Sequence, residues 1–249
     1  EKVFRFIEHA LIRRVDYMIT LTESLKKDRL RYNQRIKAIY YCPGSLFNPD
    51  NNDENLVQKF KDFNVIIYSG TISLEKGLNE ILDAFDLIKN QVPNALLMMV
   101  GGSSPKAEGS KTEELLKRKP GVIVTGWLPY TEMPKYICLG KIGLAIVNPK
   151  NYSYKICIPF KLLEQMACGL PVIAPKGFPE IERIVHAANC GILVDVSDPH
   201  QIADAVIQLL QDEKMRATAG ENAHSYIQQH HNLGILENEL LEVYHSVLK

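Results

Sequence analysis

Short apolar segments alternate with helical segments along most of this chain, and this alternation restricts the possible folds. Residues 65–69 read VIIYS and residues 95–100 read ALLMMV. Such continuously apolar runs are typical of strands that are buried on both faces. Strands that alternate with helices predict an α/β fold, a doubly wound parallel sheet in a three-layer α/β/α arrangement. Further strands are expected at 122–125, 142–147, 171–174 and 191–194, and helices at 78–89, 111–118, 131–138, 160–167, 179–186 and near the C-terminus.

Composition excludes several classes of protein. The 249 residues include 29 basic and 29 acidic side chains, so the chain lacks the basic excess of a nucleic-acid-binding protein. The longest apolar run, 95–100, is far shorter than the roughly 20 residues that cross a bilayer. The five cysteines are widely spaced and form no CxxC pair, which favours free thiols over disulfides or a zinc site. We therefore expect a cytoplasmic protein.

A polar, turn-rich stretch divides the chain. Residues 43–55 read PGSLFNPDNNDEN, which predicts an interdomain linker that buries little. Residues 1–42 are too few for an independent core. We expect them to be the tail of a truncated amino-terminal Rossmann-like domain, with helices at 3–14 and 23–32 and strands at 17–21 and 37–41. Residues 56–249 are expected to form the main domain.

The unusual residues follow the predicted strands. Gly70 precedes Thr71, Gly101 precedes Gly102, and another glycine precedes Trp127. Ligands of open parallel sheets bind beyond the carboxyl ends of the strands, where glycines let the backbone approach an anion. Parallel folds also use glycine there for turn geometry, so the pattern alone only slightly favours a nucleotide site. The chain has no GxGxxG or GxxxxGK[ST] motif, which disfavours a dinucleotide-dependent oxidoreductase and a P-loop protein.

Two lysines carry most of the chemical signal. Lys76 ends the strand-to-helix turn at 70–77 and is expected in the first helical turn, where a cation opposes the helix dipole unless an anion binds there. The alternative is a solvated surface lysine. In the helix at 160–167, Lys161 and Glu164 share a face, either as a surface ion pair or with Glu164 accepting the hydroxyls of a ribose.

At these residues the chain resembles the carboxy-terminal half of a group 1 (family four) glycosyltransferase of the GT-B fold. The resemblance covers about residues 60–248, and the helix at 232–248 resembles one that packs back toward the first domain. YMITLTESLKKDRL resembles the close of the family's amino-terminal domain. The matching stretches are SGTISLEKG at 69–77, VGG at 100–102, TGWLPYTEMPKY at 125–136, PFKLLEQMACGLPVIAPKGFPEI at 159–181 and CGILVDVSDPHQIADAVIQLL at 190–210.

The resemblance implies two catalytic residues, Lys76 on the donor diphosphate and Glu164 on the ribose diol. The family's arginine falls at Thr71 and the first of its two glutamates falls at Ile156, so both are replaced. We hypothesise that Lys161 supplies the charge missing at Thr71. The implied donor site comprises Gly70, Thr71, Lys76, Gly101, Gly102, Trp127, Leu128, Cys157, Ile158, Pro159, Phe160, Lys161 and Glu164, with 126–128 near the nucleobase and 157–160 near phosphate and sugar.

The implied reaction is retaining transfer of a hexose from a nucleoside-diphosphate sugar to an acceptor hydroxyl. No cofactor or metal is expected, because lysines and amides would hold the diphosphate. The acceptor is expected to be a carbohydrate or lipid-linked carbohydrate of bacterial cell-surface polysaccharide or lipopolysaccharide synthesis, reached at the inner face of the membrane through the missing domain. This fragment would bind donor but be inactive alone. The alternative is a non-catalytic nucleotide-sugar-binding module.

Overall fold

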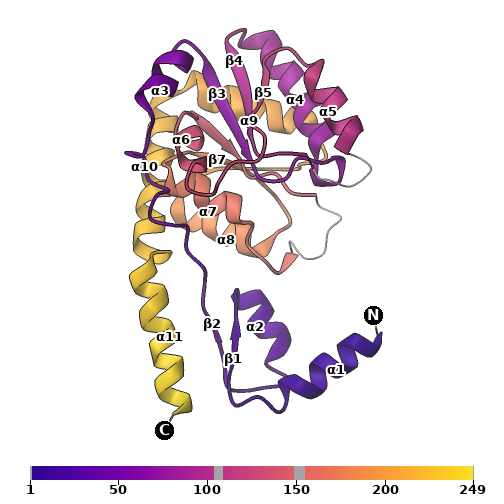
Figure 1. Ribbon diagram of the computed structural model, residues 1–249, viewed down its shortest axis with the longest axis vertical. Helices are drawn as coiled ribbons and strands as arrows, with labels where there is room; N and C mark the ends of the chain where they lie inside the picture. The colour runs from indigo at the N-terminus through magenta and orange to yellow at the C-terminus, as the bar shows by residue number, and fades with distance from the viewer. Residues whose placement is uncertain (1, 104–108, 149–154, 249) are drawn as a thin grey trace.

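The computed structural model describes residues 2–103, 109–148 and 155–248, which form an α/β/α domain with a small N-terminal segment beside it (Figure 1). In the N-terminal segment, two short parallel strands pair Met18 with Ile36. Both strands are shorter than expected, and neither is buried throughout. The elements of this segment are α1 (Lys2–Ile12), β1 (Met18–Thr20), α2 (Glu23–Arg29) and β2 (Ile36–Ala38).

The main domain contains a six-stranded sheet in which every pair of neighbours is parallel, in the order β5-β4-β3-β6-β7-β8. The strands β4 and β5 therefore follow β3 toward one edge of the sheet, and β7 and β8 follow β6 toward the other edge. This confirms the predicted doubly wound fold, and it places the topological switch point between β3 and β6. The strands are β3 (Asn64–Ser69), β4 (Ala95–Val100), β5 (Val122–Val124), β6 (Ile142–Leu144), β7 (Val172–Pro175) and β8 (Gly191–Val194).

Helices cover both faces of this sheet (Figure 1). Alternate residues of β3 enter two separate cores: Ile66 and Tyr68 pack with α4 and α9, whereas Val65 and Ile67 pack with α7, α8 and α10. The helical elements are α3 (Glu54–Phe60), the 3₁₀ turn η1 (Leu74–Lys76), α4 (Leu78–Gln91), α5 (Gly109–Lys117), α6 (Met133–Ile137), α7 (Phe160–Ala167), α8 (Pro179–Ala188), α9 (Pro199–Gln211), α10 (Glu213–His230) and α11 (Leu233–Val247).

The stretch at 43–55 buries more than expected. Phe47 is only 2% exposed and joins the core under α7, and its ring lies 4.9 Å from that of Tyr130. The stretch also leads into α3, a helix that was not expected. Asp53 caps the N-terminus of α3, because its carboxylate accepts hydrogen bonds from the backbone N–H groups of Asn55 and Leu56. This stretch is therefore packed against the main domain.

The last helix lies beside the N-terminal segment (Figure 1). Lys37 of β2 forms an ion pair with Glu242 of α11 at 2.6 Å, and Arg35 donates to the carbonyl of Ser246 at 3.1 Å. None of the helices within the described residues has the length and apolar character needed to span a membrane.

Candidate functional site

The backbones that follow β3 and β4 lie so close together that only glycine fits at position 101. Gly101 has φ +147°, and a β-carbon at this position would lie 2.1 Å from the carbonyl oxygen of Gly70. The N–H of Gly101 donates to the hydroxyl of Thr125, at the end of β5, at 3.1 Å. Three of the predicted glycine turns are thus joined at the carboxyl edge of the sheet.

Trp127 forms one wall of an open pocket at this edge. Its indole covers Gly102, where a β-carbon would lie 2.6 Å from Nε1. The indole is 63% exposed, and the pocket measures about 560 Å³, with Ser103 and Val124 among its other lining residues. Leu128 differs from its neighbour, because its half-buried side chain packs against the hydrophobic core.

Lys161 reaches from the first turn of α7 to the switch point of the sheet. Its ammonium lies 3.6 Å from the centre of the Tyr68 ring and donates to the carbonyl of Ile146 at 3.3 Å. A β-carbon on Gly70 would lie 3.9 Å from its Cε. Burial, and secondly repulsion from Lys76, hold the pKa of Lys161 well below its usual range, and Glu164 opposes this effect. The side chain is therefore no solvated surface lysine.

Lys76 does not occupy the first turn of α4, so that expectation was wrong. It ends the separate 3₁₀ turn η1, because Gly77 adopts φ +86° between the two helices. The half-buried position of Lys76 lowers the pKa of its ammonium, and Glu75 partly opposes this. Across the described parts of the chain, neither Lys76 nor Lys161 has an ion-pair partner within 4 Å. The two ammonium groups thus repel each other, and neither forms an ion pair with a carboxylate among these residues.

Glu164 lies on α7 near Lys161 and is only 5% exposed. Burial raises the pKa of its carboxyl, while a hydrogen bond from Tyr130 and the charge of Lys161 lower it. Tyr130 was missed by the sequence reasoning, although it stands within the stretch TGWLPYTEMPKY. Burial and Glu164 raise the pKa of Tyr130 to about 12, so its hydroxyl remains a donor at neutral pH.

The turn before α7 contains the remaining predicted residues. Ile158 and Pro159 are buried, Cys157 is half-buried with a thiol pKa raised by burial, and Phe160 is 56% exposed. The part of this loop at 149–154 lies outside the described residues. Phe160 stacks on Tyr41 with ring centres 4.0 Å apart.

Thr71 follows Gly70, and its carbonyl accepts a hydrogen bond from Tyr68 at 3.2 Å. Its side chain is half-buried. The structure thus brings predicted residues at the ends of β3, β4 and β5 together with Lys161 of α7 at one edge, whereas Leu128 packs against the core. Within the described residues, no group of three His, Cys, Asp or Glu side chains is placed to hold a metal ion.

Comparison with known proteins gives matches over most of the chain. The sequence model of the family described as Glycosyl transferases group 1 matches residues 50–226. The chitobiosyldiphosphodolichol beta-mannosyltransferase of Candida albicans is 24% identical over 239 residues, which cover 89% of this chain and 52% of that protein. The capsular polysaccharide biosynthesis glycosyltransferase CapM of Staphylococcus aureus is 25% identical over 211 residues, 82% of this chain and 52% of CapM.

A solved structure shows the same fold. Anabaena Alr3699/HepE, in complex with UDP and glucose, matches with a TM-score of 0.76 at 18% identity, over 96% of this chain and 66% of that one. The chain therefore spans about half the length of the two curated relatives named above. Because the family match covers well over half of the 249 residues, the chain belongs to the group 1 glycosyltransferase family.

Proposed function

We propose that this chain binds the donor of a retaining hexosyltransferase, which moves a sugar from a nucleoside-diphosphate sugar to an acceptor hydroxyl. The observation that carries the proposal is the convergence of Lys76 and Lys161 at the switch point of the sheet without an ion-pair partner among the described residues. A diphosphate there would neutralise both ammonium groups. In this proposal, residues 56–249 are the donor domain, 43–55 the linker and 1–42 the end of an acceptor domain.

The proposed chemistry follows from where charge develops. As the bond from the anomeric carbon to the diphosphate breaks, the sugar gains oxocarbenium character and the diphosphate gains negative charge. Lys76, Lys161 and backbone amides at the N-terminus of α7 stabilise that leaving group more strongly in the transition state than in the ground state. Removing one contact of this kind commonly lowers the rate by about 10²–10³.

The rest of the donor has matching surroundings. Glu164 accepts the ribose hydroxyls, and the Trp127 pocket, about 560 Å³, takes the nucleobase against the indole. The turn at 157–160 contacts the phosphate and the sugar. The UDP and glucose bound to Anabaena Alr3699/HepE support a nucleotide-sugar donor on this fold.

The biological setting is proposed from the relatives. CapM acts in capsular polysaccharide biosynthesis, which supports a carbohydrate or lipid-linked acceptor in cell-surface polysaccharide or lipopolysaccharide synthesis. The five free cysteines favour a reducing compartment such as the cytoplasm. Because the chain spans about half of the curated relatives, we expect it to bind donor without transferring sugar by itself.

A second candidate is a non-catalytic nucleotide-sugar-binding module. Thr71 and Ile156 stand at the two positions where the resemblance implies an arginine and a glutamate, and this observation favours the module. Both candidates bind the donor, but only the enzyme transfers sugar when the chain is joined to an acceptor domain.

Isothermal titration with UDP, GDP and ADP, and then with their sugars, tests the proposal. We expect one nucleoside diphosphate to bind, and Lys76→Ala to weaken that binding about tenfold or more. Lys37→Ala is the matched control, because Lys37 pairs with Glu242 away from the site. Absence of binding to all three nucleotides by the unaltered chain would refute both candidates. Binding without transfer in a two-domain protein would favour the module.

A further inference from the structure

Two hydroxyl groups from the N-terminal segment hold the turn that precedes α7. The hydroxyl of Thr22 donates to the carbonyl of Ile156 at 2.5 Å, across 134 positions of sequence. The hydroxyl of Tyr41 donates to the carbonyl of Ile158. Two alternate carbonyls of one short turn are therefore bound by side chains from a different part of the chain.

Each of these hydroxyls has a fixed orientation. Thr22 is fully buried and also caps α2, where its oxygen accepts the N–H of Leu25 at 3.1 Å. The Thr22 oxygen thus accepts one hydrogen bond from Leu25, and its own O–H donates to the carbonyl oxygen of Ile156. Burial raises the pKa of Tyr41, so its hydroxyl keeps its proton and acts as a donor. The ring of Tyr41 is held as well, because it stacks on Phe160 at 4.0 Å.

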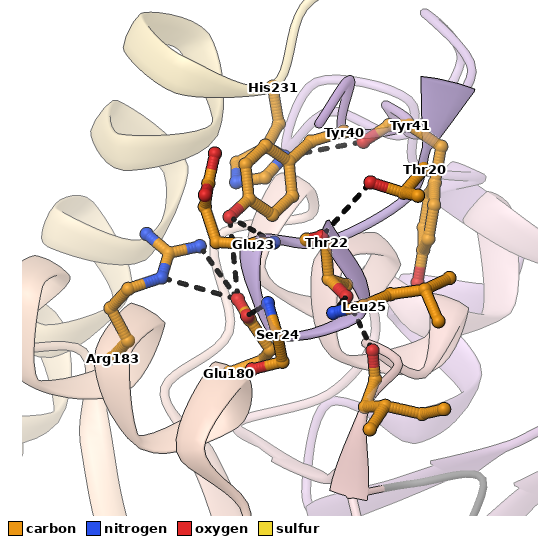
Figure 2. Close-up of polar contacts among 11 residues, drawn as sticks. Thr20, Thr22, Glu23, Ser24, Leu25, Tyr40, Tyr41, Glu180, Arg183 and His231 are labelled. Atoms are coloured by element: carbon orange, nitrogen blue, oxygen red, sulfur yellow. Dashed lines mark hydrogen bonds and ion pairs between the residues drawn. The ribbon is translucent and has the colours of Figure 1, made fainter. Parts of the chain in front are cut away.

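The N-terminal segment is itself anchored to the main domain (Figure 2). The backbone N–H of Ser24 donates to Glu180 of α8 at 2.7 Å, so a carboxylate lies at the N-terminus of α2, where it is favoured. Glu180 is buried and also contacts Arg183 at 3.3 Å. Thr22 therefore binds the turn from a helix whose position is set by α8.

A hydrogen bond that fixes a carbonyl also fixes the direction of the next N–H group, which could bind an anion. In a trans peptide the carbonyl of one residue and the N–H of the next point in opposite directions, and no peptide bond in the described residues is cis. Holding the carbonyl of Ile156 against Thr22 therefore turns the N–H of Cys157 away from the N-terminal segment. The next carbonyl bound, that of Ile158, precedes Pro159, which has no N–H to orient.

We propose that Thr22 and Tyr41 are positioning residues for the donor: they hold the turn so that the Cys157 amide faces the diphosphate. The inference rests on the proposed function, and it deepens it by giving the N-terminal segment a role in donor binding. Neither residue contacts the donor in this proposal. Each acts through the backbone of the turn.

The test compares hydroxyl-deleting variants of the full chain with matched controls. Tyr41→Phe keeps the ring that stacks on Phe160, and Thr22→Val keeps the volume of the side chain. We expect each to weaken binding of the preferred nucleoside diphosphate about two- to tenfold in isothermal titration. Thr22→Ser should restore the affinity, because it restores the hydroxyl.

The controls are the two neighbours with the same chemistry. Tyr40→Phe removes a hydroxyl that contacts Glu23 and Glu180, and Thr20→Val removes one that donates to the carbonyl of Thr22. Neither hydroxyl touches the turn, and the bond from Ser24 to Glu180 that anchors α2 remains in both variants, so both should bind as the unaltered chain does.

A second measurement separates this inference from the proposed function. Hydrogen exchange of the peptide covering 156–160, measured without ligand, should become faster in Tyr41→Phe and Thr22→Val and stay unchanged in both controls. Unchanged affinity in these two variants overturns the positioning role, whatever their exchange rates. If the unaltered chain binds no nucleoside diphosphate, the proposed function fails and the donor role fails with it, whereas the exchange data still decide whether the hydroxyls hold the turn.

Discussion

The ammonium of Lys161 on α7 lies 3.6 Å from the centre of the Tyr68 ring on β3. An aromatic ring stabilises a cation without neutralising it, whereas a carboxylate at the same place would compete with an anionic ligand. The position of Lys161 is therefore suited to a charge that must remain available. The acceptor of its hydrogen bond, the carbonyl of Ile146, is also uncharged.

The first prediction concerns the share of Lys161 in donor binding. Because Lys161 and Lys76 converge at the switch point, Lys161→Ala should weaken binding of the nucleoside diphosphate about as much as Lys76→Ala, roughly tenfold or more. Isothermal titration of the two variants side by side provides the comparison. Unchanged affinity in Lys161→Ala would remove this residue from the site.

The second prediction is that donor binding takes up a proton. Burial and Lys76 hold the pKa of free Lys161 well below its usual range, and a bound diphosphate would raise it. The complex then holds more protons than the free protein, so affinity falls as the pH rises through the pKa of free Lys161. Titrations in buffers of different ionisation enthalpy measure the uptake. Lys161→Met should reduce it, and equal uptake in this variant would contradict the assignment.

The third prediction is that replacing Glu164 stabilises the fold but weakens nucleotide binding. Burial raises its pKa in the folded state, so the ionised form destabilises the fold; this penalty is absent below the unfolded-state pKa and complete above the folded-state pKa. At pH 7, Glu164→Gln should therefore raise the unfolding free energy, by about 1 kcal/mol, while it weakens nucleotide binding. Calorimetry at pH 7 and titration of the same variant provide both readouts. A lower melting temperature at pH 7 would count against this explanation.

The fourth prediction uses the single tryptophan of the chain as a probe. A β-carbon at Gly102 would lie 2.6 Å from Nε1 of Trp127, so Gly102→Ala must displace the indole. We expect a shift in the fluorescence emission of Trp127 and weaker nucleotide binding. Gly177→Ala is a control for the alanine substitution, because a β-carbon there would meet nothing within 4 Å, although its positive φ carries some strain. An unchanged emission spectrum in Gly102→Ala would show that the indole does not cover Gly102 in solution.

The fifth prediction concerns acid stability. His231 is buried, its Nδ1 lies 3.3 Å from the carbonyl of Tyr41, and burial lowers its pKa to about 4, helped by Arg183 and His230. The fold favours neutral His231, so stability should be lost as the pH falls from about 6.5 toward 4, with a slope of up to about 1.4 kcal/mol per pH unit.

Urea unfolding between pH 7.5 and 4.5 measures that slope. His231→Gln should flatten the curve, because it removes the titrating ring. His230→Gln should change the curve far less, because burial is the largest cause of the low pKa of His231. Equal slopes in all three proteins would assign the acid sensitivity to other groups.

Local patterns predicted much of this molecule. The apolar runs of β3 and β4 indicated strands buried on both faces, and Pro159 and Gly169 marked both ends of α7 at the residues where the structure places them. The glycines at the strand ends were also predicted at the site, because a close approach of two backbones excludes any larger residue. These features depend on neighbours within a few positions.

The contacts that pattern could not predict join distant parts of the chain. Tyr130 donates a hydrogen bond to Glu164, and Thr22 donates one to the carbonyl of Ile156. The partners in each pair are far apart in the sequence, so no local pattern predicts either contact. Lys76 was misplaced for a local reason, because the left-handed conformation of Gly77 starts a new helix after it. Phe47 was expected in an exposed linker because its polar neighbours dominate the composition of that stretch.

The long separation between Thr22 and Ile156 also has a consequence for the kinetics of folding. A two-stranded ladder such as β1–β2 is marginal by itself, and its segment is tied down by partners 134 and 156 positions away, at Ile156 and Glu180. Closing such long loops is slow, because chain entropy is lost before any contact forms. The first forty residues should therefore dock late, onto a sheet that has already assembled, and should be the first to detach when the protein begins to unfold.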